Sequence, residues 1–325
     1  MLDSSAAKCP VAVVGAGTMG AGIAQIFAQA GHPVRLQARQ RETLEAALRR
    51  IRVNQDELMC HDLLAGKDAE AARARITVTQ SLTEALEGAI FVSENIPERL
   101  EVKQPLFAEL DRLTPPDTIL STNTSSLPIT QVARDTKYPE RVVGFHWFNP
   151  PHLIPLVEVI RGERSSDAAM DTTYRLARSI GKSPIRVQKD IPGFVGNRLQ
   201  RALEREFFYL ERIGACSGAD LEVALKQGLG FRWSVVGPLE HADLAGVDTH
   251  AATVALLFPL LSNDTAPPPL FAELAAQGRL GAKTGGGAYQ YGPGDVERIL
   301  SRRNAMLIDF IKVLKRHPSL RDPTA

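Results

Sequence analysis

The sequence predicts an α/β fold, in which a Rossmann-type doubly wound sheet is followed by an all-helical C-terminal domain. Short β-favouring runs alternate with amphipathic segments as far as Val187. A glycine-rich turn joins the first β-favouring run to the first amphipathic segment. Beyond the Asp190-Ile191-Pro192-Gly193 breaker the strand signals fade and helical periodicity continues. We therefore predict two domains, over residues 1–190 and 191–325.

Composition favours a small-molecule partner. The chain has 325 residues, with 38 basic and 37 acidic side chains and a formal net charge of +1, so nothing in its charge favours nucleic acid or a membrane surface. The longest apolar run, residues 251–261, is too short to span a bilayer, and no targeting segment is visible. Three widely spaced cysteines argue against a disulfide framework or a metal cluster. The expected location is the cytoplasm.

The glycine-rich turn follows the apolar run Val11 to Val14 and precedes helical spacing over Ala21 to Ala30. In this context the G-x-G-x-x-G pattern predicts dinucleotide binding. Its first glycine permits a tight turn, its second lets backbone approach a pyrophosphate, and its third lets the helix pack closely. The alternative is a plain glycine turn in an α/β protein. The predicted cofactor contacts are Gly15, Gly17, Thr18, Met19 and Gly20.

The second strand, Val34 to Gln37, ends without the acid that usually binds the ribose 2′-hydroxyl, since Ala38 follows it. Arg39 and Arg41 come next. A guanidinium matches a phosphate better than a diol, so NADP is open beside NAD. Alternatively, both arginines are solvated at the start of the next helix.

Further strand and helix signals lead to a hydroxyl-rich loop. Helix is expected over residues 41–59 and strands over residues 76–79, 89–94 and 118–121. The last of these strands opens into Thr122-Asn123-Thr124-Ser125-Ser126, at the edge where open α/β sheets bind ligands. Such a loop can also be ordinary turn chemistry.

A strand, a tight reversal and a second strand are predicted over Gly144 to Ile160. If the reversal centres near His152, then His146 and Glu158 are cross-strand neighbours. A histidine held by a carboxylate is a general base with its orienting group, although polar pairs also occur structurally.

The remaining chain is predicted to be mostly helical. After a helix over residues 167–180 and a strand over 183–187, helical segments are expected over 194–211, 218–227, 239–244, 249–261 and 296–316. Asn197, near the start of the first of these, could point back across the expected interdomain cleft or cap the helix.

Eight motifs in order resemble the L-3-hydroxyacyl-CoA dehydrogenase family over nearly the whole chain. They are GAGTMGAGIAQIFAQAG, ENIPERLEVKQPLF, STNTSSLPI, HWFNP, PLVEVI, PGFVGNR, GPLEHADLAGVDT and GAKTGGGAYQY. The resemblance implies NAD-dependent oxidation of a 3-hydroxyl group on a 3-hydroxyacyl-CoA or related 3-hydroxy acid. It also implies that the helical domain binds substrate and forms a homodimer.

The resemblance carries specific roles to this chain. It makes His146 the base, Glu158 its orienting partner, and Ser125 and Asn197 the groups that position the substrate oxygen. It also implies a place near the cofactor for Glu98, Lys103, Asn149 and Lys283.

Two departures concern the ligands. Ala38 replaces the ribose acid, and the stretch Asn54 to His61 lacks the lysine with which acyl-CoA members hold CoA. The arginines Arg49, Arg50 and Arg52 could still meet phosphates or be solvated. Other segments resemble the free-hydroxy-acid branch of gulonate and carnitine dehydrogenases, which also includes a lens crystallin. There Arg232 could clamp a substrate carboxylate or form an ordinary salt bridge.

Two other interpretations of the sequence predict different residues at the site. The β-hydroxyacid dehydrogenases share the two-domain plan but use a lysine base where this chain has Asn197. A non-catalytic dinucleotide-binding or structural protein would not need the complete set of His146, Glu158, Ser125 and Asn197.

Overall fold

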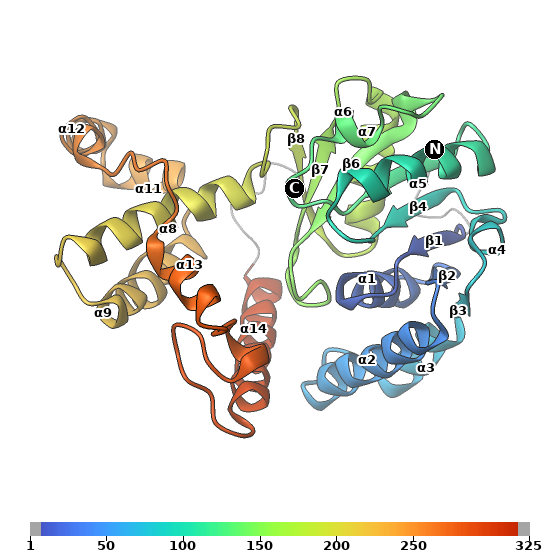
Figure 1. The fold of residues 1–325 in the computed structure, drawn as a ribbon, viewed down its shortest axis with the longest axis horizontal. Coiled ribbons are helices and arrows are strands. Elements are labelled where there is room, and N and C mark those ends of the chain that lie inside the picture. Colours follow the sequence, from blue (N-terminus) through green and yellow to red (C-terminus); the bar gives the residue numbers. More distant parts are fainter. Residues whose placement is uncertain (1–7, 318–325) are drawn as a thin grey trace. The chain divides into compact units, whose positions relative to one another are not determined.

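The chain folds as two compact units. The computed structural model describes residues 8–317 (Figure 1). Among the described residues, one unit holds residues 8–197 together with Asn304–Lys312, and the other holds Arg198–Arg303 and residues 313–317. The first unit therefore recruits a short segment from near the C-terminus.

The first unit is built on an eight-stranded sheet with the strand order β3-β2-β1-β4-β5-β6-β7-β8 (Figure 1). All neighbours are parallel except β6 and β7, which pair antiparallel. The strands are β1 (Val11–Val14), β2 (Val34–Gln37), β3 (Ile76–Thr79), β4 (Phe91–Glu94), β5 (Ile119–Thr122), β6 (Val142–Trp147), β7 (Leu156–Arg161) and β8 (Ser183–Val187). The expected strand, reversal and strand are β6 and β7.

Helices cover both faces of this sheet, and the strand residues alternate between them. Val11 and Val13 belong to one buried apolar cluster, whereas Ala12 and Val14 belong to another. The helices are α1 (Thr18–Gln29), α2 (Arg41–Cys60), α3 (Gly66–Ala74), α4 (Leu82–Leu86), α5 (Leu100–Leu113), α6 (Ile129–Val132) and α7 (Asp167–Ser179). Residues of α1, α2, α3 and α7 join the first cluster, and residues of α4, α5 and α6 join the second. The predicted doubly wound sheet is confirmed.

The second unit is helical, as predicted. Its helices are α8 (Gly196–Arg212), which begins in the first unit, then α9 (Gly218–Val223), α10 (Gly230–Trp233), α11 (Pro238–Ala245), α12 (Val247–Leu257), α13 (Pro269–Ala276) and the outer parts of α14 (Asp295–Arg316). The helix expected over residues 249–261 ends earlier, at Leu257. Pro259 then lies in a 3-10 turn, because it has no N–H to continue the α-helix.

Many apolar side chains of the second unit are exposed, including Leu239 at 86% and Phe231 at 74%. A search of residues 8–317 finds no helix with the length and apolarity needed to cross a membrane.

Candidate active site

The glycine-rich turn between β1 and α1 has the shape that a bound pyrophosphate needs. Gly15 has a φ of +96°, and a Cβ there would lie 2.7 Å from the carbonyl oxygen of Asn95. A Cβ on Gly20 would lie 1.8 Å from the carbonyl oxygen of Gly15, whereas one on Gly17 would meet nothing within 4 Å. The N-terminus of α1 also has no side-chain cap. Its first-turn N–H groups therefore fit an anionic dinucleotide.

The end of β2, where the ribose of a dinucleotide binds in this fold, offers cations and no acid. Ala38 is buried, and the side chain of Gln80 donates to the carbonyl oxygen of Arg39 at 2.9 Å. Arg41 Nε pairs with Glu45 Oε1 at 3.1 Å. The guanidinium of Arg39 is exposed and has no ion-pair partner within residues 8–317. This end suits a 2′-phosphate at least as well as a free diol.

His146 on β6 and Glu158 on β7 are direct cross-strand partners, as expected from the reversal between them. Their side chains are buried, and His146 Nδ1 lies 2.7 Å from Glu158 Oε2. The other carboxylate oxygen, Oε1, accepts from the backbone N–H groups of Val195 at 3.1 Å and Gly196 at 2.8 Å.

These donors set the charge of Glu158. Burial tends to raise the pKa of Glu158, but the hydrogen bonds from His146 and the two backbone N–H groups outweigh it and lower the pKa below its ordinary value. An ionised carboxylate only accepts hydrogen bonds, so His146 Nδ1 carries the proton between them. Nε2 is then the ring nitrogen that can accept a proton from another molecule.

Aromatic rings and a glycine fix the plane of the imidazole. The His146 ring centroid lies 4.6 Å from that of Phe148 and 5.8 Å from that of Phe194. A Cβ on Gly196 would approach Phe148 Cζ to 2.5 Å, so this close packing requires glycine. The histidine can therefore rotate little in its site.

A cavity of about 450 Å³ brings six of the predicted residues together. Its lining includes Thr18, Met19, Ser125, His146, Asn149 and Asn197. The first two come from the glycine-rich turn and the next two from the predicted catalytic set, so a dinucleotide and a small substrate could meet here.

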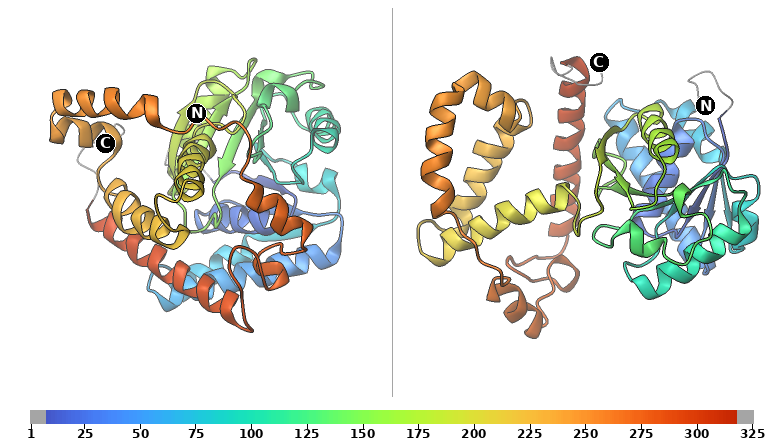
Figure 2. Two further views of the ribbon diagram at one scale, coloured as in Figure 1. Left: turned by 60° about the vertical axis from the view of Figure 1, so that its left-hand side comes forward. Right: turned by 90° about the horizontal axis from the view of Figure 1, so that it is seen from above.

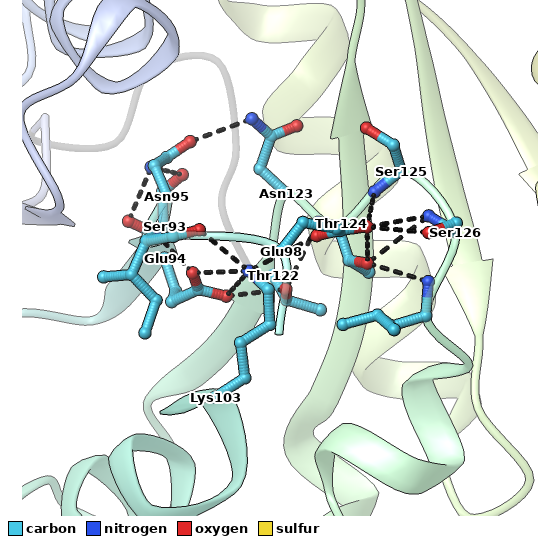
Figure 3. Close-up of polar contacts among 12 residues, drawn as sticks. Ser93, Glu94, Asn95, Glu98, Lys103, Thr122, Asn123, Thr124, Ser125 and Ser126 are labelled. Carbon is cyan, nitrogen blue, oxygen red and sulfur yellow. Dashed lines mark hydrogen bonds and ion pairs between the residues drawn. The ribbon is translucent and has the colours of Figure 1, made fainter. Parts of the chain in front are cut away.

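Ser125 lies in a loop that Glu98 holds in place (Figure 3). Glu98 Oε1 accepts from Ser125 N at 2.8 Å, Ser126 N at 2.9 Å and Thr124 Oγ1 at 2.6 Å. Burial tends to raise the pKa of Glu98, but the hydrogen bond from Thr124, the charge of Lys103 and the two backbone N–H groups together lower it. Asn197 Nδ2 donates to the carbonyl oxygen of Ser125 at 2.9 Å. The loop is thus fixed from two sides.

A buried ion pair lies beneath this loop (Figure 3). Lys103 Nζ donates to Glu94 Oε1 at 2.7 Å, to Glu94 Oε2 at 2.9 Å and to the carbonyl oxygen of Ile96 at 3.3 Å. It also lies 3.8 Å from Glu98 Oε2. Because these acceptors use the protons of the ammonium group, Lys103 fixes the carboxylate of Glu94, and its charge lies beside Glu98.

Sequence reasoning missed the amides that connect these parts. Trp147 N donates to Asn123 Oδ1 at 2.9 Å, and Asn123 Nδ2 donates to Asn95 Oδ1 at 3.0 Å. This chain of hydrogen bonds ties the ends of β4, β5 and β6 together. One available signal was that Glu94, Asn95 and Asn123 all stand at the ends of predicted strands.

Lys182 was also missed. It is buried between α7 and β8, and its Nζ donates to the carbonyl oxygens of Pro151 at 2.6 Å and Ile154 at 2.8 Å. It also lies 5.1 Å from the centroid of the Trp147 ring. Burial lowers the pKa of Lys182 to about 8. This lysine holds the reversal that joins the histidine strand to the glutamate strand.

Two predicted residues belong to the second unit. Arg232 is exposed at the end of α10, and Lys283 is exposed in the 3-10 turn Ala282–Thr284. Their roles stay predictions.

Comparison with known proteins identifies the family. Residues 10–191 match the model of the 3-hydroxyacyl-CoA dehydrogenase NAD-binding domain, and residues 193–291 match the model of its C-terminal domain. Among sequences, 5-formyl-3-hydroxy-2-methylpyridine 4-carboxylate 5-dehydrogenase of Mesorhizobium japonicum is 35% identical over 94% of this chain and 98% of its own. The solved structure of a dehydrogenase for the same pyridine compound, an NAD⁺-dependent dismutase, has a TM-score of 0.88 at 33% identity and covers 95% of this chain and 99% of its own.

Two other relatives are named for different substrates. The probable 3-hydroxybutyryl-CoA dehydrogenase of Bacillus subtilis is 38% identical over 86% of this chain and 96% of its own. The L-carnitine dehydrogenase of Streptomyces griseus is 38% identical over 75% and 73%. These matches confirm the resemblance, including its free-hydroxy-acid side. This chain is a member of the 3-hydroxyacyl-CoA dehydrogenase family and an NAD-dependent oxidoreductase.

Proposed function

We propose that this enzyme oxidises the hydroxyl-bearing carbon of a small hydroxy acid or its thioester to a ketone, with His146 as the general base. The carrying observation is the buried contact of 2.7 Å between His146 Nδ1 and Glu158 Oε2, on a ring that also lines the cavity. NAD, when bound, supplies the hydride acceptor.

The residues of the chain handle the proton and the orientation. His146 Nε2 takes the hydroxyl proton, and the charge of Glu158 stabilises the imidazolium that forms. The Ser125 hydroxyl, which lines the cavity, and the Asn197 amide hold the substrate oxygen. Acid–base groups of this kind contribute factors of about 10² to 10⁴ in rate.

The same groups could oxidise an aldehyde, which is a second candidate function. It is favoured by the full-length match to a relative named for a 5-formyl pyridine carboxylate. The hydrate of an aldehyde carries an O–H and a C–H on one carbon. If His146 removed the O–H proton while the C–H hydride passed to bound NAD, the hydrate would become the carboxylic acid.

We further propose that the ribose end of the site admits a 2′-phosphate, so that NADP serves beside NAD. The support is the absence of an acid at Ala38 and the exposed guanidinium of Arg39. Arg41 contributes less, because it already pairs with Glu45.

Other assignments rest on the resemblance. Asn149 and Lys283 contact the cofactor, and Arg232 clamps a substrate carboxylate. The small number and wide spacing of the three cysteines support a reducing, cytoplasmic location. The exposed apolar side chains of the second unit, among them Leu239 and Leu244, support a homodimer, since a monomer rarely exposes so many. Light scattering that gives twice the mass of one chain would support the dimer.

Replacing His146 with glutamine tests the proposed function. Glutamine keeps a polar group of similar size but cannot take a proton, so turnover should fall by about 10² to 10⁴ while the NAD dissociation constant changes little. His152→Gln, on the same reversal, is the matched control. Turnover within about tenfold of the wild type would remove His146 from the role of base.

A further inference from the structure

The end of β6 carries His146 past the point at which β5 stops. β5 and β6 stay in register until Thr122 lies opposite Gly144, where β5 ends. Beyond that point β6 continues to Trp147 in register with β7. The backbone on either side of His146 therefore needs another partner where β5 is missing, because a buried strand N–H without an acceptor is costly.

The side chain of Asn123 supplies this partner. Asn123 directly follows β5, and its Oδ1 accepts from the backbone N–H of Trp147 at 2.9 Å. Trp147 is 2% exposed, so water has little access to this N–H. The amide oxygen thus takes the place of a strand carbonyl and extends the support of the sheet to the residue after His146.

A chain of donors and acceptors fixes the orientation of the Asn123 amide (Figure 3). A backbone N–H can only donate, so the oxygen of Asn123 faces Trp147, and its Nδ2 donates to Asn95 Oδ1 at 3.0 Å. The Asn95 amide is then oriented as well, and its Nδ2 donates to the carbonyl oxygen of Ser93 at 3.0 Å. Turning either amide over would place donor against donor or acceptor against acceptor, so each has one stable orientation.

Asn95 also contacts the glycine-rich turn of the NAD-binding domain. Its backbone N–H donates to the carbonyl oxygen of Val14 at 2.7 Å, and a Cβ on Gly20 would lie 3.5 Å from Asn95 Cβ. In the sheet, β4 lies between β1 and β5, and β6 is next to β5 (Figure 2). Two side-chain amides therefore join the turn that follows β1 to the strand that carries His146.

We propose that Asn123 is a positioning residue for His146, held in turn by Asn95, and that it sets the distance of the histidine from the bound cofactor. This inference rests on the proposed dehydrogenase function. The hydride and the proton leave the C–H and O–H groups of one substrate carbon, so their acceptors must stand at a fixed separation. Glu158 fixes the rotation of the His146 ring, whereas Asn123 fixes the backbone that carries the ring.

Asn123→Ala tests this role, with Asn54→Ala as the matched control. Asn54 Nδ2 donates to Gln25 Oε1 at 3.0 Å, so the control also removes a hydrogen bond between two side-chain amides, here between α1 and α2. The substrate is 3-hydroxybutyrate or its CoA thioester, whichever the wild type turns over faster. In Asn123→Ala, kcat should fall by about 10 to 100 fold, while the substrate KM and the NAD dissociation constant stay within about twofold.

Asn123→Asp separates the acceptor from the donor of the amide. The carboxylate keeps an acceptor for the Trp147 N–H, so kcat should recover at least part of the loss seen in Asn123→Ala. A loss below about threefold in Asn123→Ala, or no recovery in Asn123→Asp, would overturn the proposal.

A double-variant cycle with His146→Gln shows whether Asn123 acts through the histidine. Once the histidine is gone there is no base to position, so Asn123→Ala should lower the remaining turnover by less than about twofold. The same fold-loss in both backgrounds would overturn the proposal. If Asn123→Ala no longer binds NAD, the cycle is run with Asn123→Ser, whose hydroxyl is one bond too short to reach Trp147 N.

Failure of the positioning role and failure of the proposed function give different results. Turnover that falls in His146→Gln but not in Asn123→Ala would remove the positioning role and leave His146 as the base. Turnover that is unchanged in both variants would count against the proposed function itself.

Discussion

The site around His146 and the end of β2 differ in how completely their polar groups are used. At the ends of β6 and β7, both oxygens of Glu158 are engaged and the histidine has one free ring nitrogen. At the end of β2, Arg39 is exposed and its guanidinium has no ion-pair partner within residues 8–317. Side chains that are already hydrogen-bonded to one another have a fixed orientation and protonation, which determines the reaction they can catalyse. An exposed cation without an ion-pair partner can bind any of several anionic ligands.

This difference explains why the reaction can be inferred more closely than the ligands. Fixed hydrogen bonds leave His146 one proton-accepting atom, which defines a reaction class. An exposed guanidinium can accept a phosphate, a carboxylate or water. Changes at the reaction end should therefore have large effects on rate, and changes at the ribose end should alter selectivity.

After His146→Gln, the largest effect is expected from Glu158→Gln. The amide keeps the shape but loses the charge that stabilises the imidazolium, so kcat should fall by about 10² to 10³ with little change in NAD affinity. Steady-state kinetics and a binding titration would measure this, and Asp171→Asn on α7 is the control. A loss below fivefold would show that the histidine needs no orienting charge.

The same variant has a defined stability profile with pH. Because the folded-state pKa of Glu158 is lowered, its stabilising contribution is fully present above its ordinary value of 4.5 and is lost as the pH falls through the folded-state pKa. The difference in unfolding free energy between the wild type and Glu158→Gln should shrink as the pH falls below 4.5. Denaturant unfolding at pH 7 and pH 3 would measure it, and an equal difference at both values contradicts the expected linkage.

Glu98→Ala should have the next largest effect. It removes the acceptor of four hydrogen bonds to the Ser125 loop, so kcat should fall by about 10 to 100 fold through misplacement of the Ser125 hydroxyl. Glu98→Gln keeps one acceptor oxygen and should restore part of the rate. If Ala and Gln give the same rate, then Glu98 does not position the loop through these bonds.

A smaller effect is expected from Arg39→Ala, and it should appear in only one cofactor. Losing the guanidinium should weaken NADP binding by about tenfold and leave NAD binding unchanged. Titration of intrinsic fluorescence with each reduced cofactor would measure both constants, with Arg41→Ala as the control. Equal effects on the two cofactors would exclude a contact between Arg39 and the 2′-phosphate. The end of β2 would then not discriminate between NAD and NADP.

The smallest effect is expected from Lys182→Met, and it concerns stability. The pKa of Lys182 is about 8 in the fold against an ordinary 10.5, so the cost of burying its charge is present below pH 8 and is relieved as the pH rises toward 10.5. Deprotonation of Lys182 by itself should therefore raise the Tm of the wild type by about 2 to 4 °C as the pH rises from 8 toward 10.5. Thermal unfolding at pH 7.5 and pH 9.5 should show the gain reduced in the variant. An unchanged gain would mean that another group titrates.

Much of the fold and the site could be predicted because local patterns determined them. The pairing of His146 with Glu158 followed from their equal distance to a proline-rich reversal, since antiparallel register fixes cross-strand partners. The glycine-rich turn could be predicted because a β-favouring run precedes it and helical spacing follows it. By contrast, the bracing of Ser125 by Glu98 joins loops 27 residues apart, and no periodicity reveals such a hydrogen bond.

The packing of the middle of α14 in the first unit could not be predicted from the sequence either. Its periodicity predicts a helix with one apolar face, and α14 is that helix. The periodicity does not indicate which surface of the protein this apolar face packs against. The partner surface on α2 lies about 250 residues earlier. Contacts of this separation follow from the whole fold, so the sequence suggested only that the last helix belonged with the other helices.

The place of Asn304–Lys312 in the first unit also sets an order of assembly during synthesis. A ribosome delivers the sheet and its helices long before it delivers this segment, so the apolar surface around Leu58 and Leu153 stays uncovered until residues 304–312 have been synthesised. A nascent or C-terminally truncated chain would expose that surface to chaperones and to aggregation. The nucleotide-binding unit can thus begin folding first, yet it is completed only after residues 198–303 of the second unit have been synthesised.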